Sequence, residues 1–236
     1  NLVAVPLKEL MEKLLIVLSE KEKNIIKRRF ALDRKEHETL AKIGNRYHVT
    51  RERIRQIQNS AIRKLQRHVM HTPISKINSV GKKIIMEHAG LILEKTLYEL
   101  MGKKLPLTSE MQYFTLSLEL DNTLVKIGNT AQFLPYWKMT NIPVERLMKI
   151  SEMAKKELEK SAKVMTETEL IKKIANKGEK EYDANETFIA SLLRIDKKIL
   201  FTEKGIGLKN WREINPRAIR DKIFFLLREL KKPMHF

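Results

Sequence analysis

Four polar residues in one stretch of the chain carry side chains of the types that read the edges of DNA base pairs. They are Arg51, Glu52, Arg55 and Gln56. Arginine binds the O6 and N7 atoms of guanine, glutamine binds the N6 and N7 atoms of adenine, and glutamate accepts a hydrogen bond from the N4 amino group of cytosine. At helical spacing, the four lie in the first turns of one helix, the part that a helix-turn-helix motif places in a major groove. This stretch therefore predicts direct reading of DNA sequence.

A second set of residues suits contacts with DNA phosphates, which position a protein but carry no sequence information. The set consists of Thr50, Arg53, Asn59, Arg63, Lys64 and Arg67. All of them are expected on the same helix, which should begin with Thr50 as its N-cap and run to about Arg67.

The opposite face of this helix is apolar and needs other helices to cover it. The apolar stripe consists of Ile54, Ile57, Ala61, Ile62 and Leu65. A supporting helix and a tight turn are expected in residues 39–48, where Leu40, Ile43 and Tyr47 would pack against the stripe.

Two further helices are expected before this pair. Ser19 and Glu22 have the spacing of a capping box, which predicts a helix from there through Phe30. Pro6 suits the first turn of an earlier helix that would run to Leu18. Four short helices, each with one apolar side, are enough for a small domain.

Residues 10–67 resemble region 4 of the bacterial sigma-70 family. The family pattern LSxxExxIIxxRF is met at residues 18–30, and TLxxIG is met at residues 39–44. The pattern VTRERIRQI follows at residues 49–57, and AIRKL follows at residues 61–65.

The resemblance implies binding to the minus-35 element of promoter DNA in the major groove, with base contacts from Arg51, Glu52, Arg55 and Gln56. It also implies a surface on residues 10–32 that binds the flap-tip of the RNA polymerase β subunit. A complete sigma factor carries its minus-10 and core-binding segments before region 4, whereas nine residues precede the match here. We therefore expect a fragment of a longer protein, or a sigma-like protein that is not a complete sigma factor.

The composition limits the partners and the kinds of site. A net charge of +18 and an isoelectric point near 9.9 favour a polyanionic partner, although a solvated basic surface would have the same composition. The absence of Cys excludes disulfides and thiolate metal sites, and it fits a reducing cytosol. The expected location of such a DNA-binding protein is cytoplasmic and nucleoid-associated. No apolar run reaches the roughly 20 residues of a membrane span, so no membrane partner is expected.

The second half of the chain repeats itself at an offset near 73 residues. Phe114 and Phe188 open similar segments, and each is followed 23 positions later by a tryptophan, Trp137 or Trp211. Self-similarity over several such landmarks indicates a duplicated structural unit.

Each copy has the pattern of helices followed by a β-hairpin, which is the order of a winged helix. In the second copy we expect a helix over residues 143–162 and a capping box of Thr166 and Glu169. A third helix should begin near Asp183 or Asn185.

The hairpin of the second copy is expected to have strands at residues 199–201 and 208–211, joined by a glycine turn at residues 205–207. Residues 217–236 then resemble the opening helix of a HARE-HTH domain, the winged module found in the polymerase delta subunit and in some restriction and chromatin proteins.

The expected fold class is therefore mainly α, with a helix-turn-helix domain followed by two winged-helix repeats and a truncated third unit. The predicted domains cover residues 1–71, 73–141, 142–215 and 216–236.

No constellation of residues indicates catalysis or a cofactor. His68 and His71 lack a third metal ligand, and residues 205–207 lack the lysine of a phosphate-binding loop. The sequence thus predicts a protein that is not an enzyme and has no cofactor, metal ion or small-molecule substrate.

Three functions remain open at this point. The first is a sigma-related transcription factor that binds double-stranded promoter DNA and the RNA polymerase core. The second is a delta-like, polymerase-associated module in which DNA reading is secondary. The third is the DNA-targeting part of a larger enzyme.

Overall fold

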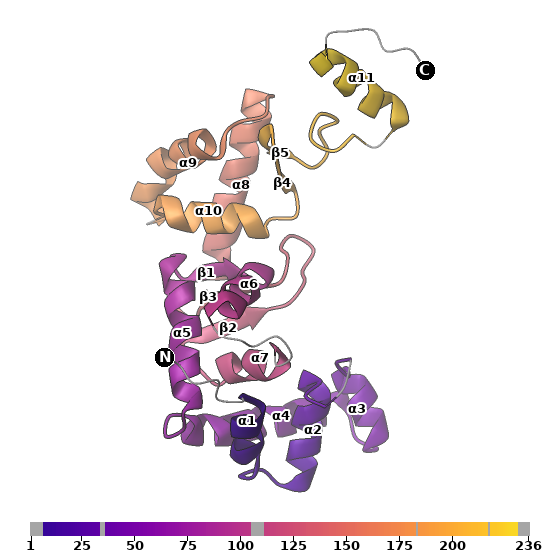
Figure 1. Ribbon diagram of the computed structural model, residues 1–236, viewed down its shortest axis with the longest axis vertical. Coiled ribbons are helices and arrows are strands. Elements are labelled where there is room, and N and C mark those ends of the chain that lie inside the picture. Colours follow the sequence, from indigo (N-terminus) through magenta and orange to yellow (C-terminus); the bar gives the residue numbers. More distant parts are fainter. Residues whose placement is uncertain (1–6, 34–35, 105–110, 183, 217, 231–236) are drawn as a thin grey trace. The chain divides into compact units, whose positions relative to one another are not determined.

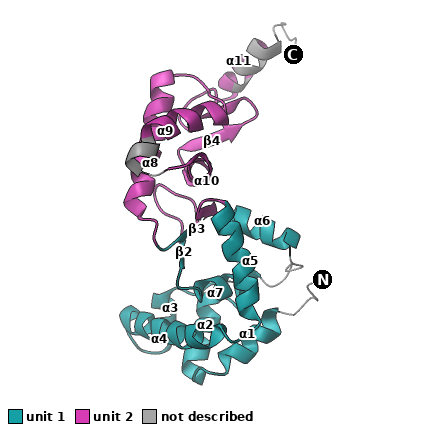
Figure 2. Cartoon of the chain, turned by 90° about the vertical axis from the view of Figure 1, so that its left-hand side faces the viewer, with its two compact units in different colours: residues 1–87, 94–126, 137–140 teal, residues 88–93, 127–136, 141–236 magenta. Residues whose placement is uncertain are grey.

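The computed structural model describes residues 7–33, 36–104, 111–182, 184–216 and 218–230. As predicted, the chain is mainly helical, with small β-sheets (Figure 1). It divides into two compact units, which Figure 2 colours separately. The first comprises Asn1–Glu87, Glu94–Lys126 and Trp137–Thr140, and the second comprises His88–Leu93, Ile127–Tyr136 and Asn141–Phe236.

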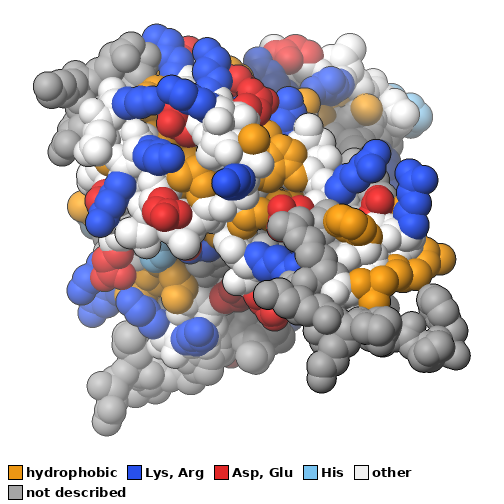
Figure 3. Space-filling model, turned by 90° about the horizontal axis from the view of Figure 1, so that it is seen from above, with side chains coloured by type: hydrophobic (Ala, Val, Ile, Leu, Met, Phe, Trp, Pro, Cys, Tyr) orange, Lys and Arg blue, Asp and Glu red, His pale blue; other side chains and the backbone are white. Residues whose placement is uncertain are grey.

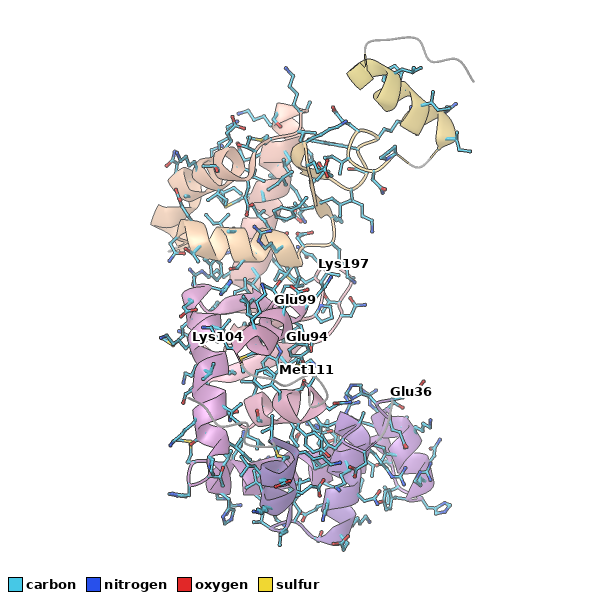
Figure 4. The ribbon with its side chains drawn as sticks, viewed as in Figure 1. Glu36, Glu94, Glu99, Lys104, Met111 and Lys197 are labelled. Carbon is cyan, nitrogen blue, oxygen red and sulfur yellow. The ribbon has the colours of Figure 1, made fainter. Side chains whose placement is uncertain are left out.

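The first unit is built mainly from helices. They are α1 (Leu7–Leu15), α2 (Glu20–Phe30), α3 (Leu40–Arg46), α4 (Arg51–Val69), α5 (Ile74–Glu87), α6 (Glu94–Lys104) and α7 (Met111–Glu119). Strands β2 (Leu124–Ile127) and β3 (Tyr136–Met139) are neighbours in one sheet. Glu94 and Met111, labelled in Figure 4, mark where α6 and α7 begin.

Helix α1 buries one apolar stripe and stops earlier than predicted. The buried residues are Leu7, Met11, Leu14 and Leu15. The helix ends at Leu15 and not at Leu18, because the next three N–H groups bond to carbonyls three residues back, as in a turn. Pro6, predicted to open this helix, lies outside the described residues.

Helix α2 begins as the sequence predicted. The Ser19 hydroxyl accepts a hydrogen bond from the N–H of Glu22, and the Glu22 carboxylate accepts one from the N–H of Ser19, so both halves of the capping box are formed. The helix ends at Phe30, and Ala31 follows in the left-handed conformation with φ 55°.

Helices α5 and α7 approach each other closely. A Cβ atom on Gly81 would lie 2.7 Å from the Leu118 Cδ2 atom, so any larger residue at this position of α5 would force the Leu118 side chain to move. Beside it, the buried Asn78 side chain donates to the carbonyl oxygen of Ser117 at 2.7 Å. These two contacts fix the position of α7 against α5.

The second unit contains β1 (Leu91–Leu93), α8 (Val144–Ser161), α9 (Glu167–Tyr182), α10 (Glu186–Ile195), β4 (Ile199–Thr202), β5 (Gly205–Leu208) and α11 (Ile219–Leu230). Strands β4 and β5 form an antiparallel hairpin in which Ile199 lies opposite Leu208 and Thr202 lies opposite Gly205. Helices α8, α9 and α10 pack against one another.

The helix starts predicted for this unit are confirmed. Helix α8 falls within residues 143–162. The N–H groups of Thr166 and Glu169 donate to each other's side chains at 3.1 and 3.3 Å, which is the predicted capping box. Asn185 is the N-cap of α10 and accepts from the N–H of Phe188.

The hairpin differs from the prediction, because its glycines lie in a strand and not in the turn. Gly205 and Gly207 belong to β5, and the chain turns at residues 203–204. The reason is close packing: a Cβ on Gly205 would lie 2.4 Å from the Met165 carbonyl oxygen, and one on Gly207 would lie 2.5 Å from Ile214 Cγ1. The predicted second strand, residues 208–211, is therefore wrong except for Leu208.

Both halves of the predicted repeat show one order of elements. The first runs α5, β1, α6, α7, β2, β3, and the second runs α8, a bridge at Met165, α9, α10, β4, β5. Helices α6 and α9 begin at Glu94 and Glu167, which are 73 positions apart. This order is typical of winged helices, but the number of repeats and the predicted domain boundaries stay predictions.

Candidate nucleic-acid interface

Helices α3 and α4 form a helix-turn-helix whose core comes from three helices. Ile25 of α2, Ile43 of α3 and Ile54 of α4 are fully buried and form one cluster. Leu40, Tyr47, Val49 and Ile57 pack against it and are partly buried. The sequence predicted this packing of α3 on the apolar stripe of α4, and the prediction is confirmed.

The turn between the two helices depends on Gly44. A Cβ atom there would lie 2.7 Å from the carbonyl oxygen of Val49, closer than real Cβ atoms come to backbone. His48 completes the turn with a left-handed φ of 53°, and the N–H of Val49 donates to the Gly44 carbonyl at 3.0 Å. The turn therefore sets the direction in which α4 leaves α3.

Helix α4 begins at Arg51 with Thr50 as its N-cap, as predicted, and continues to Val69, two residues past the predicted end. The Thr50 hydroxyl accepts from the N–H of Arg53 at 3.1 Å. A defined start matters here, because the candidate base-reading side chains belong to the first two turns.

The four predicted base-reading residues all lie on the solvent side of α4. Arg51, Glu52, Arg55 and Gln56 are exposed, as is Arg53. The core residue Ile54 points the opposite way and is 0% exposed. The structure thus brings together one polar face at the start of α4, of the kind that enters a major groove in helix-turn-helix proteins.

Two hydrogen-bonded pairs of side chains fix the orientation of the polar groups on this face of α4. The Arg55 guanidinium donates to both carboxylate oxygens of Glu52, at 2.6 and 2.8 Å. Arg53 donates to the amide oxygen of Gln56 at 3.3 Å. The hydrogen bond from Arg55 lowers the pKa of the Glu52 carboxyl below its usual range, so Glu52 is an anion at neutral pH and accepts hydrogen bonds only.

The predicted backbone-contacting residues continue along α4. Arg63 and Arg67 are exposed, while Asn59 is half-buried. Arg67 donates to the carbonyl oxygen of Arg63 at 3.4 Å, which leaves most of its donors directed to solvent. These arginines extend the polar face toward the end of the helix, where phosphate contacts are expected.

Lys64 has a structural partner that the sequence did not reveal. Its ammonium donates to both carboxylate oxygens of Glu22, at 2.7 and 2.9 Å, across 42 positions of sequence. The hydrogen bond from Lys64 is the largest influence on Glu22 and lowers the pKa of that carboxyl. Lys64 therefore ties α4 to the start of α2, and its assignment to the DNA backbone stays a prediction.

A second ion pair fixes the entry to α3. The Arg28 guanidinium and the buried Glu38 carboxylate are 2.8 Å apart, and Arg29 donates to the Glu38 carbonyl oxygen at 3.2 Å. The N–H of Glu38 in turn donates to the Arg28 carbonyl at 3.1 Å. This clip joins the end of α2 to the segment before α3.

The structure also draws attention to two basic residues of α3 that the sequence did not single out. Lys42 and Arg46 are exposed and four positions apart on the supporting helix, which in helix-turn-helix proteins crosses the DNA backbone. The signal was present as two basic residues at helical spacing before the turn.

Other kinds of site have no support among the described residues. No group of three His, Asp or Glu side chains in this part of the chain could hold a metal ion. Within the same residues, no helix has both the length and the apolar character needed to cross a membrane. On the face drawn in Figure 3, Lys and Arg side chains lie among acidic and hydrophobic ones, so charge alone does not mark an interface on that face.

Two comparisons with known proteins concern this helix-turn-helix. Residues 14–67 match the family described as "Sigma-70, region 4". The chain is also 48% identical over 60 residues to an "RNA polymerase sigma factor SigA" of Bacillus sp. The alignment covers 25% of this chain and 16% of that sigma factor.

The family match covers α2 and α3 completely, together with most of α4. The two comparisons indicate that this segment is a non-enzymatic, DNA-binding module of the sigma type. The segment from α5 onward lies outside the match, so its winged-helix and HARE-HTH interpretation rests on the repeat and the order of elements alone.

Proposed function

We propose that this protein is a sigma-related transcription factor that reads minus-35-like promoter DNA with α4 and contacts RNA polymerase. The observation that carries the proposal is the exposed set Arg51, Glu52, Arg55 and Gln56, at the start of a helix held by a helix-turn-helix core. A module that bound only protein would not need side chains suited to guanine, cytosine and adenine together on one exposed face.

The roles of the residues divide by position along the helix. Arg51, Glu52, Arg55 and Gln56 read base edges in the major groove. The residues Thr50, Arg53, Asn59, Arg63, Lys64 and Arg67 hold the phosphates, and the exposed Lys42 of α3 adds one more contact of this kind.

The contact with polymerase belongs to the surface of α1 and α2, residues 10–32, where the flap-tip of the β subunit would bind. The family match supports this assignment because it begins at residue 14 and includes α2. The matched relative is itself described as an RNA polymerase sigma factor. A cytoplasmic, nucleoid-associated location follows from such a role.

The part of the chain from α5 to α11 is proposed to consist of two winged-helix repeats and the first helix of a third, HARE-HTH-like unit. The common order of elements in the two copies supports this. A second candidate function is a delta-like, polymerase-associated module. It is favoured by the substantial part of the chain that lies outside the region 4 match.

The proposal is tested by fluorescence anisotropy with two labelled duplexes, one bearing a minus-35 consensus and one with the same bases scrambled, across a salt series. Tighter binding to the consensus at every salt concentration is expected. Equal affinities with a steep salt slope would show phosphate binding without base reading and would favour the polymerase-associated module.

A further inference from the structure

In a winged helix, as in any helix-turn-helix, the second helix of the pair is the one that enters DNA. By the repeat, α7 and α10 occupy this place in the two copies, as α4 does in the first helix-turn-helix. If α7 and α10 had the same task as α4, their polar faces should be exposed in the same way.

Helix α7 does not have an exposed polar face. Its residues from Tyr113 to Leu118 are all buried, and none of its nine residues is exposed. Its sequence, MQYFTLSLE, contains no Arg, Lys or Asn. Its two residues of base-reading type, Gln112 and Glu119, are half-buried at opposite ends of the helix, and it has no basic side chain for phosphates.

Several elements of the first unit cover α7. Helix α5 reaches it through Gly81 and Asn78, and α1 and α2 pack against it. The Tyr98 ring of α6 lies edge-on to Phe114, with ring centroids 6.1 Å apart, and its hydroxyl is 2.6 Å from the Thr115 hydroxyl. The Tyr113 hydroxyl donates to Asp33, which follows α2, at 3.3 Å.

Helix α10 is covered in a corresponding way inside the second unit. Five of its six buried residues are apolar, and β1 packs against it in addition to α8 and α9. The Ser191 hydroxyl donates to the carbonyl oxygen of His88 at 3.2 Å, across 103 positions of sequence. The carbonyl oxygen of Ile195 accepts from the N–H of Leu134 at 2.8 Å.

The residues just after α10 continue this docking. Asp196 is 2% exposed and accepts a hydrogen bond from the Ser151 hydroxyl, which in turn accepts one from the Gln132 side chain at 2.8 Å. The ammonium of Lys197, labelled in Figure 4, donates to the carbonyl oxygen of Thr130. A carboxylate can stay buried only where hydrogen bonds replace its hydration, so these partners are part of the docked arrangement.

The one basic residue of α10 is also engaged. The Arg194 guanidinium lies 2.7 Å from a Glu167 carboxylate oxygen and stacks on the Phe201 ring at 4.7 Å. The exposed residues at the start of α10 are Glu186 and Thr187, without the arginines and the glutamine that α4 has at its start.

We infer that α7 and α10 are docking helices, which bind other segments of their own chain, and that α4 is the helix of the three that enters DNA. The part of this inference that concerns α4 rests on the proposed function. The part that concerns α7 and α10 stands on their burial and does not depend on it.

The test uses the lack of native cysteine, because each single cysteine then reports one position. Three variants of the full chain are compared: Ser191→Cys on the docked face of α10, Thr187→Cys on its exposed face, and Ser60→Cys on α4. Ser191 is 6% exposed, whereas Thr187 and Ser60 are exposed. The rate of thiol alkylation is measured with and without the minus-35 consensus duplex.

The docked arrangement predicts that Ser191→Cys reacts at least about 10-fold more slowly than the other two variants, with or without DNA. DNA should slow the reaction of Ser60→Cys and leave Thr187→Cys unchanged. Thr187 is at the surface, so this variant keeps the test valid even if Ser191→Cys fails to fold.

Fast alkylation of a folded Ser191→Cys, or protection of Thr187→Cys by DNA, would overturn the inference. A Ser60→Cys variant that DNA does not protect would count against the proposed function and against the role of α4, while slow alkylation of Ser191→Cys would still establish the docking of α10.

Discussion

Arg55 binds Glu52 on its own helix, and by the proposed function it binds a guanine when the protein meets its DNA site. The two carboxylate hydrogen bonds, at 2.6 and 2.8 Å, hold the guanidinium in a defined orientation on an exposed face. Such pairs at the surface contribute little to stability, so the value of this one lies in orientation.

Arg55→Ala is expected to cost roughly 1 to 3 kcal/mol of binding free energy on the preferred duplex and to reduce the preference over scrambled DNA. Arg67→Ala is the matched control, since Arg67 is also exposed on α4 but is assigned to phosphates. Its loss should weaken both duplexes alike in an anisotropy titration. Equal losses for Arg55→Ala on the two duplexes would contradict base reading.

The Glu22–Lys64 pair makes the stability of the helix-turn-helix depend on pH. Because the folded-state pKa of Glu22 is lowered, the pair stabilises the fold at neutral pH, and this contribution is lost as the pH falls through that pKa. Glu22→Gln removes the charge and keeps a side chain suited to the capping box.

We expect Glu22→Gln to lower the free energy of unfolding by about 1 kcal/mol at pH 7, a modest figure because Lys64 is partly solvated. The difference from the parent protein should shrink as the pH falls below 4.5, the ordinary pKa of this carboxyl, measured by urea unfolding at pH 7 and in acid. A difference that persists unchanged in acid would show that the charge is not responsible.

At the scale of elements, the helix-turn-helix holds together through the cluster where α2, α3 and α4 meet. Ile54 is 0% exposed at its centre, while Ile57 packs on its edge and is only partly buried. The two residues lie on the same stripe of α4, so they allow a comparison in which only burial differs.

Ile54→Ala should therefore lower the free energy of unfolding by about 2 to 5 kcal/mol, and Ile57→Ala should cost clearly less. Chemical denaturation followed by circular dichroism measures both. If Ile57→Ala were the more damaging change, the orientation of α4 in the core would have to be different.

Local signals made much of this part predictable. The capping box of Ser19 and Glu22, the N-cap Thr50 and the apolar stripe of α4 each depend on residues within a few positions of one another. The set Arg51, Glu52, Arg55 and Gln56 could be found in the same way, and whether it reads bases stays a prediction.

Contacts between distant segments could not be predicted. The pairing of Lys64 with Glu22 spans 42 positions, and the pairing of Ser191 with His88 spans 103. No local pattern encodes either contact. The glycines of β5 were mistaken for a turn because their close neighbours, Met165 and Ile214, come from other segments.

At the scale of the whole molecule, each compact unit contains one of the two tryptophans. Trp137 belongs to the first unit and is 0% exposed, whereas Trp211 belongs to the second unit and is half-buried beside Gly207. Each therefore serves as a probe of its own unit.

The Trp211→Phe variant keeps Trp137 as its single tryptophan, and the Trp137→Phe variant keeps Trp211. The emission maximum of Trp137 should lie at shorter wavelength than that of Trp211, because burial removes water from the indole. Iodide should also quench the fluorescence of Trp137 less. The two variants then follow the unfolding of the two units separately in urea. Equal emission maxima in the folded proteins would contradict the burial of Trp137.

The pairs on the face of α4 have a consequence for how a protein of this kind would search a genome. With Glu52 bonded to Arg55 and Gln56 bonded to Arg53, three of the four proposed reading side chains already have hydrogen-bond partners in the absence of DNA. On non-specific DNA the helix would then slide while bound through its phosphate contacts alone, with both side-chain pairs intact. The pairs would break only where base edges form better hydrogen bonds with these side chains. Glu52→Gln, which weakens the pair with Arg55, should therefore diffuse more slowly along non-specific DNA, and single-molecule tracking of equal or faster diffusion would refute this view of the search.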